Sequence, residues 1–321
     1  MEDIQCIFCS RDSDQTVIEE SGYKGRKCPQ CGLIFISPRP TLTEILSLYS
    51  HIETNVSTET LMSAAFVKRL YAKHNLKIIT KFAKNGSILE IGAGAGYFLD
   101  EARKEGFEVY GIEINSIKAD FIRRELGIPC VESPLDASLF DEKKFNIIYH
   151  CDVISHFYDP ISEFRKINGM LKENGIIVFE TGNFGDVKQK YYRFVTRFQY
   201  PDHLFFFSEN NVQELLRRTG FEFIKIYRYS ILPQLAISTM LQRVIDITRF
   251  KGTPNNITKH SMAGTPSTNV SKTSISSFSF KQLFKNAHGY FFYLVRYRIG
   301  YLVPKKGRPQ TVIFIARKVR E

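Results

Sequence analysis

The most constraining feature of this 321-residue chain is the run SILEIGAGAG at residues 87–96. Apolar residues around Glu90 lead into alternating glycines, and a helical pattern follows from Tyr97 to Glu105. This order predicts a buried strand, a tight turn and the N-terminus of a helix. Glycine has no Cβ, so the backbone N–H groups of such a turn can close on a ligand. The run predicts a site for a nucleoside-bearing cofactor, bound by Glu90, Gly92, Ala93, Gly94 and Gly96.

A second strand is expected at 107–113, and it ends in an acid, Glu113, followed by Ile114. A carboxylate at this place can accept hydrogen bonds from the hydroxyls of a ribose, so both residues belong to the predicted cofactor site. Further strands are expected at 129–133, 145–151 and 175–181, and helices at 96–105, 115–126 and 159–173. Short apolar strands that alternate with helices predict an α/β fold with a mostly parallel sheet covered on both faces.

The flanking segments complete the predicted organisation. Helical patterns occupy 41–50, 57–83 and 209–220, and two strands at 221–229 and 311–318 are expected to pair antiparallel at one sheet edge. Between them, 251–279 is rich in Ser, Thr, Asn, Pro and Gly and is expected to be flexible. The predicted units are a zinc ribbon (1–40), a helical lead-in (41–86), the cofactor-binding core (87–230), an insertion (231–310) and a final strand (311–321).

Four of the six cysteines form two pairs near the N-terminus, with the spacing C-x2-C-x18-C-x2-C. Each pair is typical of a short turn whose thiolates converge on one side, and two such pairs supply a closed tetrahedral Zn²⁺ site. Four thiolates leave no open coordination position, so the zinc is expected to be structural. The predicted ligands are Cys6, Cys9, Cys28 and Cys31.

The net charge of +11 is unevenly distributed. Fourteen of the 44 lysines and arginines but only one of the 33 acids follow Asp246, so this part carries +13 and residues 1–246 carry −2. A nearly neutral core argues against a catalytic face that clamps nucleic acid. The sequence also lacks an N-terminal apolar run and an uninterrupted 18-residue apolar segment, so we expect a cytoplasmic protein.

The glycine turn departs from the dinucleotide-binding pattern G-x-G-x-x-G, because Tyr97 stands in place of the third glycine. Glu90 would repel a pyrophosphate, whereas the ammonium and positive sulfur of a sulfonium amino acid would favour a nearby carboxylate. The pattern E-x-G-x-G-x-G resembles motif I of the class I S-adenosylmethionine (SAM) methyltransferases. In that resemblance Glu113 matches the acid on the ribose hydroxyls, and the fold implied is a Rossmann-like, seven-stranded, mostly parallel sheet with an antiparallel last strand.

Other segments extend the resemblance over roughly residues 6–230 and the last strand. Residues 151–160 (CDVISHFYDP) resemble the family's segment after the fourth strand, and residues 200–208 (YPDHLFFFS) resemble its HLYFFS motif. Ser155 and Asn146 replace acids usual in the family. The cysteine ribbon followed by Pro38-Arg-Pro40 is similar to zinc-ribbon methyltransferases of sugar and cell-surface polysaccharide pathways. The long C-terminal domain of the deoxysugar C-methyltransferases is absent, so their reaction cannot simply be transferred.

Methyl transfer to a hydroxyl or carbon acid requires a base, and His156 and His203 stand where loops leave the fourth and fifth strands. Each histidine could equally fix its loop through a hydrogen bond, and His203 is slightly favoured as the base. Its loop carries Lys188, Lys190, Arg193 and Arg197 among aromatics, which suits a lid over an anionic substrate such as a glycan precursor, or else is an ordinary solvated face. Asp152 and Asp136 are further candidates for cofactor contacts.

The segment 281–303 is aromatic, basic and of helical period, with Tyr290, Tyr293, Tyr297 and Tyr301 on one face. Two interpretations carry equal weight. The segment, with the basic residues up to 308, lies on an anionic membrane at the inner face, or its aromatic stripe packs on the core or on a second subunit. Arg296 and Arg298 argue against a helix that spans the bilayer.

Three functional hypotheses remain open on the sequence. The first is a SAM-dependent methyltransferase that acts on a hydroxyl or activated carbon of a sugar, a polysaccharide or lipid-linked precursor, or a related small molecule. The second is an NAD(P)-dependent oxidoreductase, which Tyr97 and Glu90 disfavour. The third is a non-catalytic module that binds SAM and associates with RNA or membrane. The acceptor, the methylated atom and the oligomeric state are not identified by these patterns.

Overall fold

The computed structural model describes residues 1–52, 57–136, 140, 143–195, 197–240, 275–303 and 306–319. Most of the segment expected to be flexible, 251–274, lies outside these residues. Its last five residues are helical, because helix α8 begins at Ile275. None of the described helices is both long enough and apolar enough to cross a membrane.

A seven-stranded sheet forms the centre of the molecule, in the order β10-β11-β8-β7-β4-β5-β6. Strand β11 is antiparallel to both of its neighbours, whereas the pairs from β8 to β6 are parallel. The predicted sheet and the predicted pairing of the last two strands are therefore confirmed. The strands span β4 Ser87–Ile91, β5 Glu108–Ile112, β6 Cys130–Val131, β7 Phe145–Cys151, β8 Leu171–Gly182, β10 Phe221–Ser230 and β11 Gln310–Lys318.

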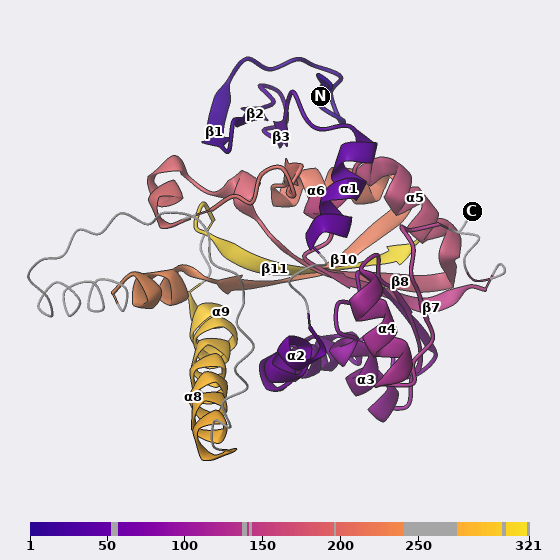
Figure 1. Ribbon diagram of the computed structural model, residues 1–321. Helices are drawn as coiled ribbons and strands as arrows, with labels where there is room; N and C mark the ends of the chain where they lie inside the picture. The colour runs from indigo at the N-terminus through magenta and orange to yellow at the C-terminus, as the bar shows by residue number, and fades with distance from the viewer. Residues whose placement is uncertain are drawn as a thin grey trace, which may run out of the picture.

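Helices cover both faces of this sheet (Figure 1). Helices α2 (Thr58–Ile79), α3 (Tyr97–Lys104) and α4 (Ser116–Arg124) lie on one side, and α1 (Leu42–Ile52), α5 (Pro160–Met170) and α6 (Glu209–Arg218) on the other. Local sequence fixes where these helices begin. The Asp159 carboxylate accepts the first two free N–H groups of α5, and Ser208 and Asn211 form a reciprocal capping box at the start of α6.

The boundary between α5 and β8 differs from the prediction. We expected a helix to residue 173 and a strand from 175, but α5 ends at Met170 and β8 begins at Leu171. Leu171 pairs with Phe145, and the next pair joins Ile176 to Ile147, so the intervening residues form an irregularity in the ladder. Leu171 is buried and belongs to the strand, although the apolar periodicity alone would assign it to the helix.

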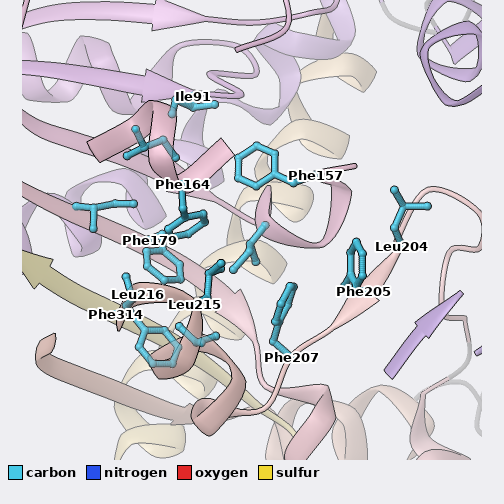
Figure 2. Close-up of a cluster of buried hydrophobic side chains, with 14 of the residues drawn as sticks. Ile91, Phe157, Phe164, Phe179, Leu204, Phe205, Phe207, Leu215, Leu216 and Phe314 are labelled. Atoms are coloured by element: carbon cyan, nitrogen blue, oxygen red, sulfur yellow. The ribbon is translucent and has the colours of Figure 1, made fainter. Parts of the chain in front are cut away.

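Two hydrophobic cores lie on the two faces of the sheet. The core beneath α5 and α6 is built largely from phenylalanines, and Figure 2 shows Phe164, Phe179 and Phe314 packed beside Leu215 and Leu216. Phe179 and Phe314 stack across neighbouring strands with ring centroids 5.3 Å apart. The segment of Leu204, Phe205 and Phe207 continues this core towards the N-terminal ribbon (Figure 2).

The N-terminal ribbon shares a sheet with the core. Its strands β1 (Thr16–Glu20), β2 (Tyr23–Lys27) and β3 (Ile34–Ile36) are joined by β9 (Phe205–Phe206), which pairs antiparallel with β3. Arg39 strengthens the junction, because its guanidinium lies 3.7 Å from the ring centroid of Tyr158 and donates to the Tyr158 carbonyl at 2.8 Å. The ribbon is therefore anchored by both backbone and side-chain contacts.

The C-terminal helical segment packs on α2 through part of its surface. It consists of α8 (Ile275–Leu294), a π-helical turn (Val295–Ile299) and α9 (Gly300–Leu302). Tyr293 and Tyr297 contact Tyr71 of α2, and Tyr297 is buried. Leu283, Phe284 and Phe291 are exposed instead. Contact with the core thus accounts for the inner tyrosines but leaves the outer apolar residues uncovered among the described residues.

Candidate active site

The glycine turn lies between β4 and α3 and adopts the backbone conformation that its composition predicts. Gly92, Gly94 and Gly96 all have positive φ, at 68°, 57° and 70°. A Cβ on Gly92 would lie 2.7 Å from Val153, and one on Gly96 would lie 2.7 Å from Ile122. A Cβ on Gly94 would meet nothing within 4 Å. Gly92 and Gly96 are needed for packing, and Gly94 borders open space.

Glu90 is buried near the end of β4, and its Oε2 has no hydrogen-bond partner among the described residues. Burial raises the pKa of this carboxyl well above its usual value, and the charge of Glu113 adds to the effect. An unpaired buried carboxylate oxygen is costly unless a ligand supplies a donor or a positive charge. Glu90 therefore fits the ammonium group of an amino-acid-like ligand.

Glu113 directly follows β5 and contacts the glycine turn. Its Oε2 accepts the N–H of Gly94 at 2.7 Å, and its Oε1 accepts the N–H of Asn115 at 3.0 Å. The carboxylate is thus tied to the glycine turn and to the start of α4. Ile114 is half-buried beside it, and Asp136 is exposed in the loop after β6.

A cavity of about 420 Å³ opens against the glycine turn. Five of the predicted residues line it, namely Glu90, Gly92, Ala93, Gly94 and Asp152. The other predicted residues, Gly96, Glu113, Ile114 and Asp136, are not among its described lining residues. The wall also contains side chains that the sequence patterns did not assign to the site: Lys68, Tyr71 and Asn75 from α2, Lys118 from α4, Tyr149 from β7, Glu180 from β8 and Arg296 from the C-terminal segment.

Glu180 is the centre of a buried hydrogen-bond network at the carboxyl end of β8. Asn75 Nδ2 donates to its Oε2 at 2.6 Å, and Tyr297 OH donates to its Oε1 at 3.0 Å. Asn75 also donates to Tyr149 OH at 2.7 Å, while its own Oδ1 has no partner in the part of the chain that the structure describes. Burial and the charge of Asp152 raise the pKa of Glu180 to about 6, although both donors oppose the change.

Asp152 directly follows β7 and has a φ of 53°, which is unusual for a non-glycine residue. Its backbone N–H donates to the carbonyl of Glu180 at 2.9 Å, so the two acids are held at adjacent strand ends. Removal from bulk water raises the pKa of Asp152, and the charges of Arg296, His156 and Lys68 oppose the shift. The cavity therefore combines three acids (Glu90, Asp152 and Glu180) with three cations (Lys68, Lys118 and Arg296) on its walls.

The two predicted catalytic histidines lie together but outside the described cavity lining. His156 ends a short 3-10 turn (Ile154–His156), and its Nδ1 is 2.9 Å from Asp202 Oδ1. The His203 ring centroid is 4.7 Å from that of His156. Burial lowers the pKa of His203 to about 4, and the charge of His156 contributes. These contacts support a positioned imidazole pair, and no contact assigns either ring a catalytic role.

The four ribbon cysteines converge as the spacing predicts. Their sulfur atoms all lie within 4.8 Å of one another, and Cys6 Sγ is 3.4 Å from Cys31 Sγ. Tetrahedral zinc–thiolate geometry, with bonds of about 2.3 Å, places sulfurs about 3.8 Å apart. The donor set and its spacing therefore fit a Zn²⁺ ion. Asn211 Nδ2 donates to the Cys31 carbonyl at 3.1 Å and connects this cluster to α6.

The strand order, the glycine turn and the acids at the ends of β4 and β5 define a Rossmann-like fold of the class I SAM-dependent methyltransferases. The profile of the family described as "Methyltransferase domain" matches residues 63–226, about half of the chain. The chain belongs to this methyltransferase-domain family.

Individual relatives are more distant. A ubiquinone biosynthesis O-methyltransferase from Histophilus somni is 26% identical over 106 residues, which cover 30% of this chain and 44% of the relative. The corresponding protein of Pasteurella multocida is 27% identical over 111 residues, with 30% and 46% covered. The chain thus spans under half the length of these curated relatives. A SAM-dependent methyltransferase from Archaeoglobus fulgidus has a solved structure with a TM-score of 0.48 and 19% identity, covering 82% of this chain and all of that one.

Some of the unpredicted cavity residues left a signal in the sequence. Lys68, Tyr71 and Asn75 recur at helical spacing on one face of α2, mixed with the apolar positions that predicted the helix. Glu180 is an acid near the end of an otherwise apolar strand, as Glu90 is. Arg296 left no such signal. Its position in the cavity wall depends on how the segment that carries it, more than 60 residues after β10, packs on the core.

Proposed function

We propose that this protein transfers the methyl group of SAM to a hydroxyl or activated carbon of a small molecule. The observation that carries the proposal is the composition of the cavity, in which the glycine turn and the unpaired Glu90 face Asp152, Glu180, Lys68 and Arg296. SAM supplies a methyl group on a positively charged sulfur, together with an ammonium and a carboxylate. The cavity offers acids for the positive groups and cations for the negative one.

The residues that would hold the cofactor follow from this charge pattern. Glu90 would accept hydrogen bonds from the ammonium, and Lys68 on α2 would pair with the carboxylate. Glu113 is the candidate for the ribose hydroxyls, with Ile114 and Asp136 as neighbours of the nucleoside. The N–H of Gly94 is held by Glu113, so ribose binding and the shape of the turn would depend on the same carboxylate.

The acceptor is proposed to be an anionic small molecule. Arg296 reaches the cavity from the C-terminal segment, and Lys188, Lys190 and Arg193 are exposed on the loop after β8. A sugar nucleotide or another phosphorylated or lipid-linked glycan precursor has the matching charge. The names of the curated relatives favour transfer to oxygen. An acceptor panel with radiolabelled SAM, scored for alkali-stable label, distinguishes methyl ethers from methyl esters.

Two sites are candidates for the base that takes the proton of the acceptor. The first is the pair of His203 and His156, with Asp202 as the group that orients His156. The second is Glu180, because it lines the cavity and its pKa of about 6 is close to a working pH. We include both, since they predict different pH dependences of the rate.

Calorimetric titration with SAM, S-adenosylhomocysteine and NAD⁺ tests the cofactor assignment. We expect binding of the first two and none of NAD⁺, and the reverse result would contradict the proposal in favour of an oxidoreductase. Screening cell extracts for protein-dependent methyl incorporation tests turnover. Tight SAM binding without methyl incorporation from any extract would support the alternative of a non-catalytic SAM-binding module.

We also propose that the cysteine cluster binds structural Zn²⁺. Metal analysis should give one zinc per chain, and a chelator should lower the melting temperature because the ribbon shares β9 with the core. Cys6→Ser should produce the same loss without a chelator. Equal melting temperatures for the treated and untreated protein would contradict a structural role.

The outer face of α8 is proposed to contact an anionic membrane surface, which for a cytoplasmic protein is the inner leaflet. Leu283 and Phe284 are about two-thirds exposed, and Lys285 lies next to them. Leu283→Gln/Phe284→Gln should abolish flotation with phosphatidylglycerol vesicles, while the wild type floats. Deleting the whole helix is a poorer test, because it also removes Arg296 from the cavity.

A further inference from the structure

A second cavity of about 350 Å³ lies beside the cofactor cavity, on a neighbouring face of α2. Three elements form it, and in each of them the lining residues recur with the spacing of a helix or a strand. Lys73, Lys77 and Lys81 follow one another every fourth residue along α2 and just beyond its end. The C-terminal segment contributes Tyr293, Tyr297, Arg298 and Tyr301, and β10 contributes Tyr227 and Tyr229.

The charged side chains that line this cavity are all positive. Four cations line it, and no acid is among its described lining residues. Lys73 is paired with Glu101 at 3.5 Å, whereas Lys77, Lys81 and Arg298 have no carboxylate within ion-pair distance in the part of the chain that the structure describes. Three unneutralised cations around one concave surface produce a field that attracts anions.

The aromatic walls are well ordered by mutual contacts. The Tyr297 ring stacks on His74 at a centroid distance of 3.8 Å and meets Tyr229 edge-on at 4.9 Å. His74 Nε2 is 3.0 Å from Tyr229 OH. Burial and the nearby charges of Arg298, Lys77 and Lys81 lower the pKa of His74 to about 4, which agrees with the positive field. The imidazole is therefore neutral at physiological pH, and the cations are supplied by the other side chains.

We propose that this lysine–tyrosine cavity binds the phosphate group of a small phosphate ester, either a soluble metabolite or a phospholipid headgroup. Ammonium, guanidinium and phenol groups are the donors that bind phosphate oxygens, and the tyrosine rings supply apolar surface for the organic part of the ester. The site does not depend on the methyltransferase proposal, because none of its lysines or its arginine lines the cofactor cavity.

Two probes distinguish the sources of the phosphate. Binding of glycerol 3-phosphate is measured by calorimetry at low salt, and binding of lipid is measured by flotation with phosphatidylcholine vesicles that contain or lack phosphatidic acid. The test variant is Lys77→Gln/Lys81→Gln, which changes exposed side chains at the end of α2. The control is Lys24→Gln/Lys144→Gln, with the same change in net charge on exposed lysines elsewhere.

The wild type should bind at least one probe, and affinity should fall about tenfold or more in the test variant but stay unchanged in the control. Binding of glycerol 3-phosphate would assign a soluble ligand, and binding of phosphatidic acid vesicles alone would assign a lipid. Equal affinities in the wild type and the test variant, or no binding of either probe by the wild type, would overturn the proposal. Unchanged SAM binding by the test variant shows that it is folded.

Discussion

At the scale of single residues, Gly94 is the position where the turn opens into the cavity. Its neighbours Gly92 and Gly96 are confined by Val153 and Ile122, but Gly94 has free space where a side chain would be. A space that protein atoms leave empty beside a positive-φ glycine is where a ligand can approach the backbone most closely. Substitution at Gly94 therefore tests the site more directly than substitution at either neighbour.

Gly94→Asp should weaken SAM binding by about 100-fold or more, because the new carboxylate would occupy the ligand's space next to Glu90 and Glu113. Calorimetric titration measures the effect. Gly106→Asp is the matched control, since Gly106 also has a positive φ and open surroundings but is not among the cavity residues. It should lose similar stability and keep its SAM affinity. Wild-type affinity in Gly94→Asp would refute this placement of the site.

The pH dependence of turnover separates the two candidate bases. A base must be deprotonated to act, so the rate should rise as pH increases through its pKa. If Glu180 is the base, kcat/KM rises through about pH 6, and Glu180→Gln removes this limb. If His203 is the base, the rise lies near pH 4 and His203→Asn removes it instead. A rate that is flat between pH 3 and pH 7 would exclude both.

The sequence could predict site residues that lie close to a motif and could not predict those that depend on packing. Glu90 lies near the end of a strand with a plain apolar pattern, Gly92 and Asp152 directly follow such strands, and all three line the cavity. Glu180 and Asn75 form part of the site only because α2 and β8, about a hundred residues apart in the sequence, pack together. Their hydrogen bond exists only in the folded protein. No local pattern encodes such a contact.

At the scale of elements, the ribbon and the core are held together because β9 of the core joins the sheet of the ribbon. Glu20 at the end of β1 accepts the backbone N–H groups of Phe198 and Tyr200, so the loop before β9 is fixed as well. The spacing of the cysteines predicted the cluster but not its dependence on β9. That dependence arises because a three-stranded ribbon leaves an open edge, which a strand from the core can cover.

Gly25→Ala tests this junction. A Cβ on Gly25 would lie 2.2 Å from the hydroxyl of Tyr200, a buried side chain, so the variant should lose about 1–3 kcal/mol of stability. Gly169→Ala in α5 is the control, because its Cβ would meet nothing within 4 Å, and the helix should become no less stable. Urea unfolding compares the two variants. Equal midpoints would show that the ribbon can separate from the core without cost.

At the scale of the whole molecule, the sheet is completed by a strand from the C-terminal end of the described chain. The family match ends at residue 226, yet β11 lies between β8 and β10 and pairs with both. The sequence predicted the pairing of β10 and β11, because both show strand patterns. It did not place β11 inside the sheet, because two antiparallel partners at an edge can be ordered in either way.

A chain that ends at Val303 should therefore fail to fold, although it retains the whole family match and the helix that carries Arg296. Without β11, β8 and β10 each lose the strand that pairs with them. The buried side chains from Val312 to Ala316 are also lost from both cores. A chain that ends at Val319 is the control and should show the wild-type circular dichroism spectrum. Cooperative thermal unfolding of the shorter chain would contradict the expectation.

The position of β11 also bears on how the chain reaches its native state. Strands β10 and β11 are adjacent in the sheet but separated by 79 residues, so their pairing requires closure of a very long loop. Contacts of such high sequence separation slow folding. During synthesis, the other six strands of this sheet leave the ribosome before β11 exists, and the edges of β8 and β10 stay exposed meanwhile. Aggregation during folding should therefore depend on the length of the insertion that separates β10 from β11.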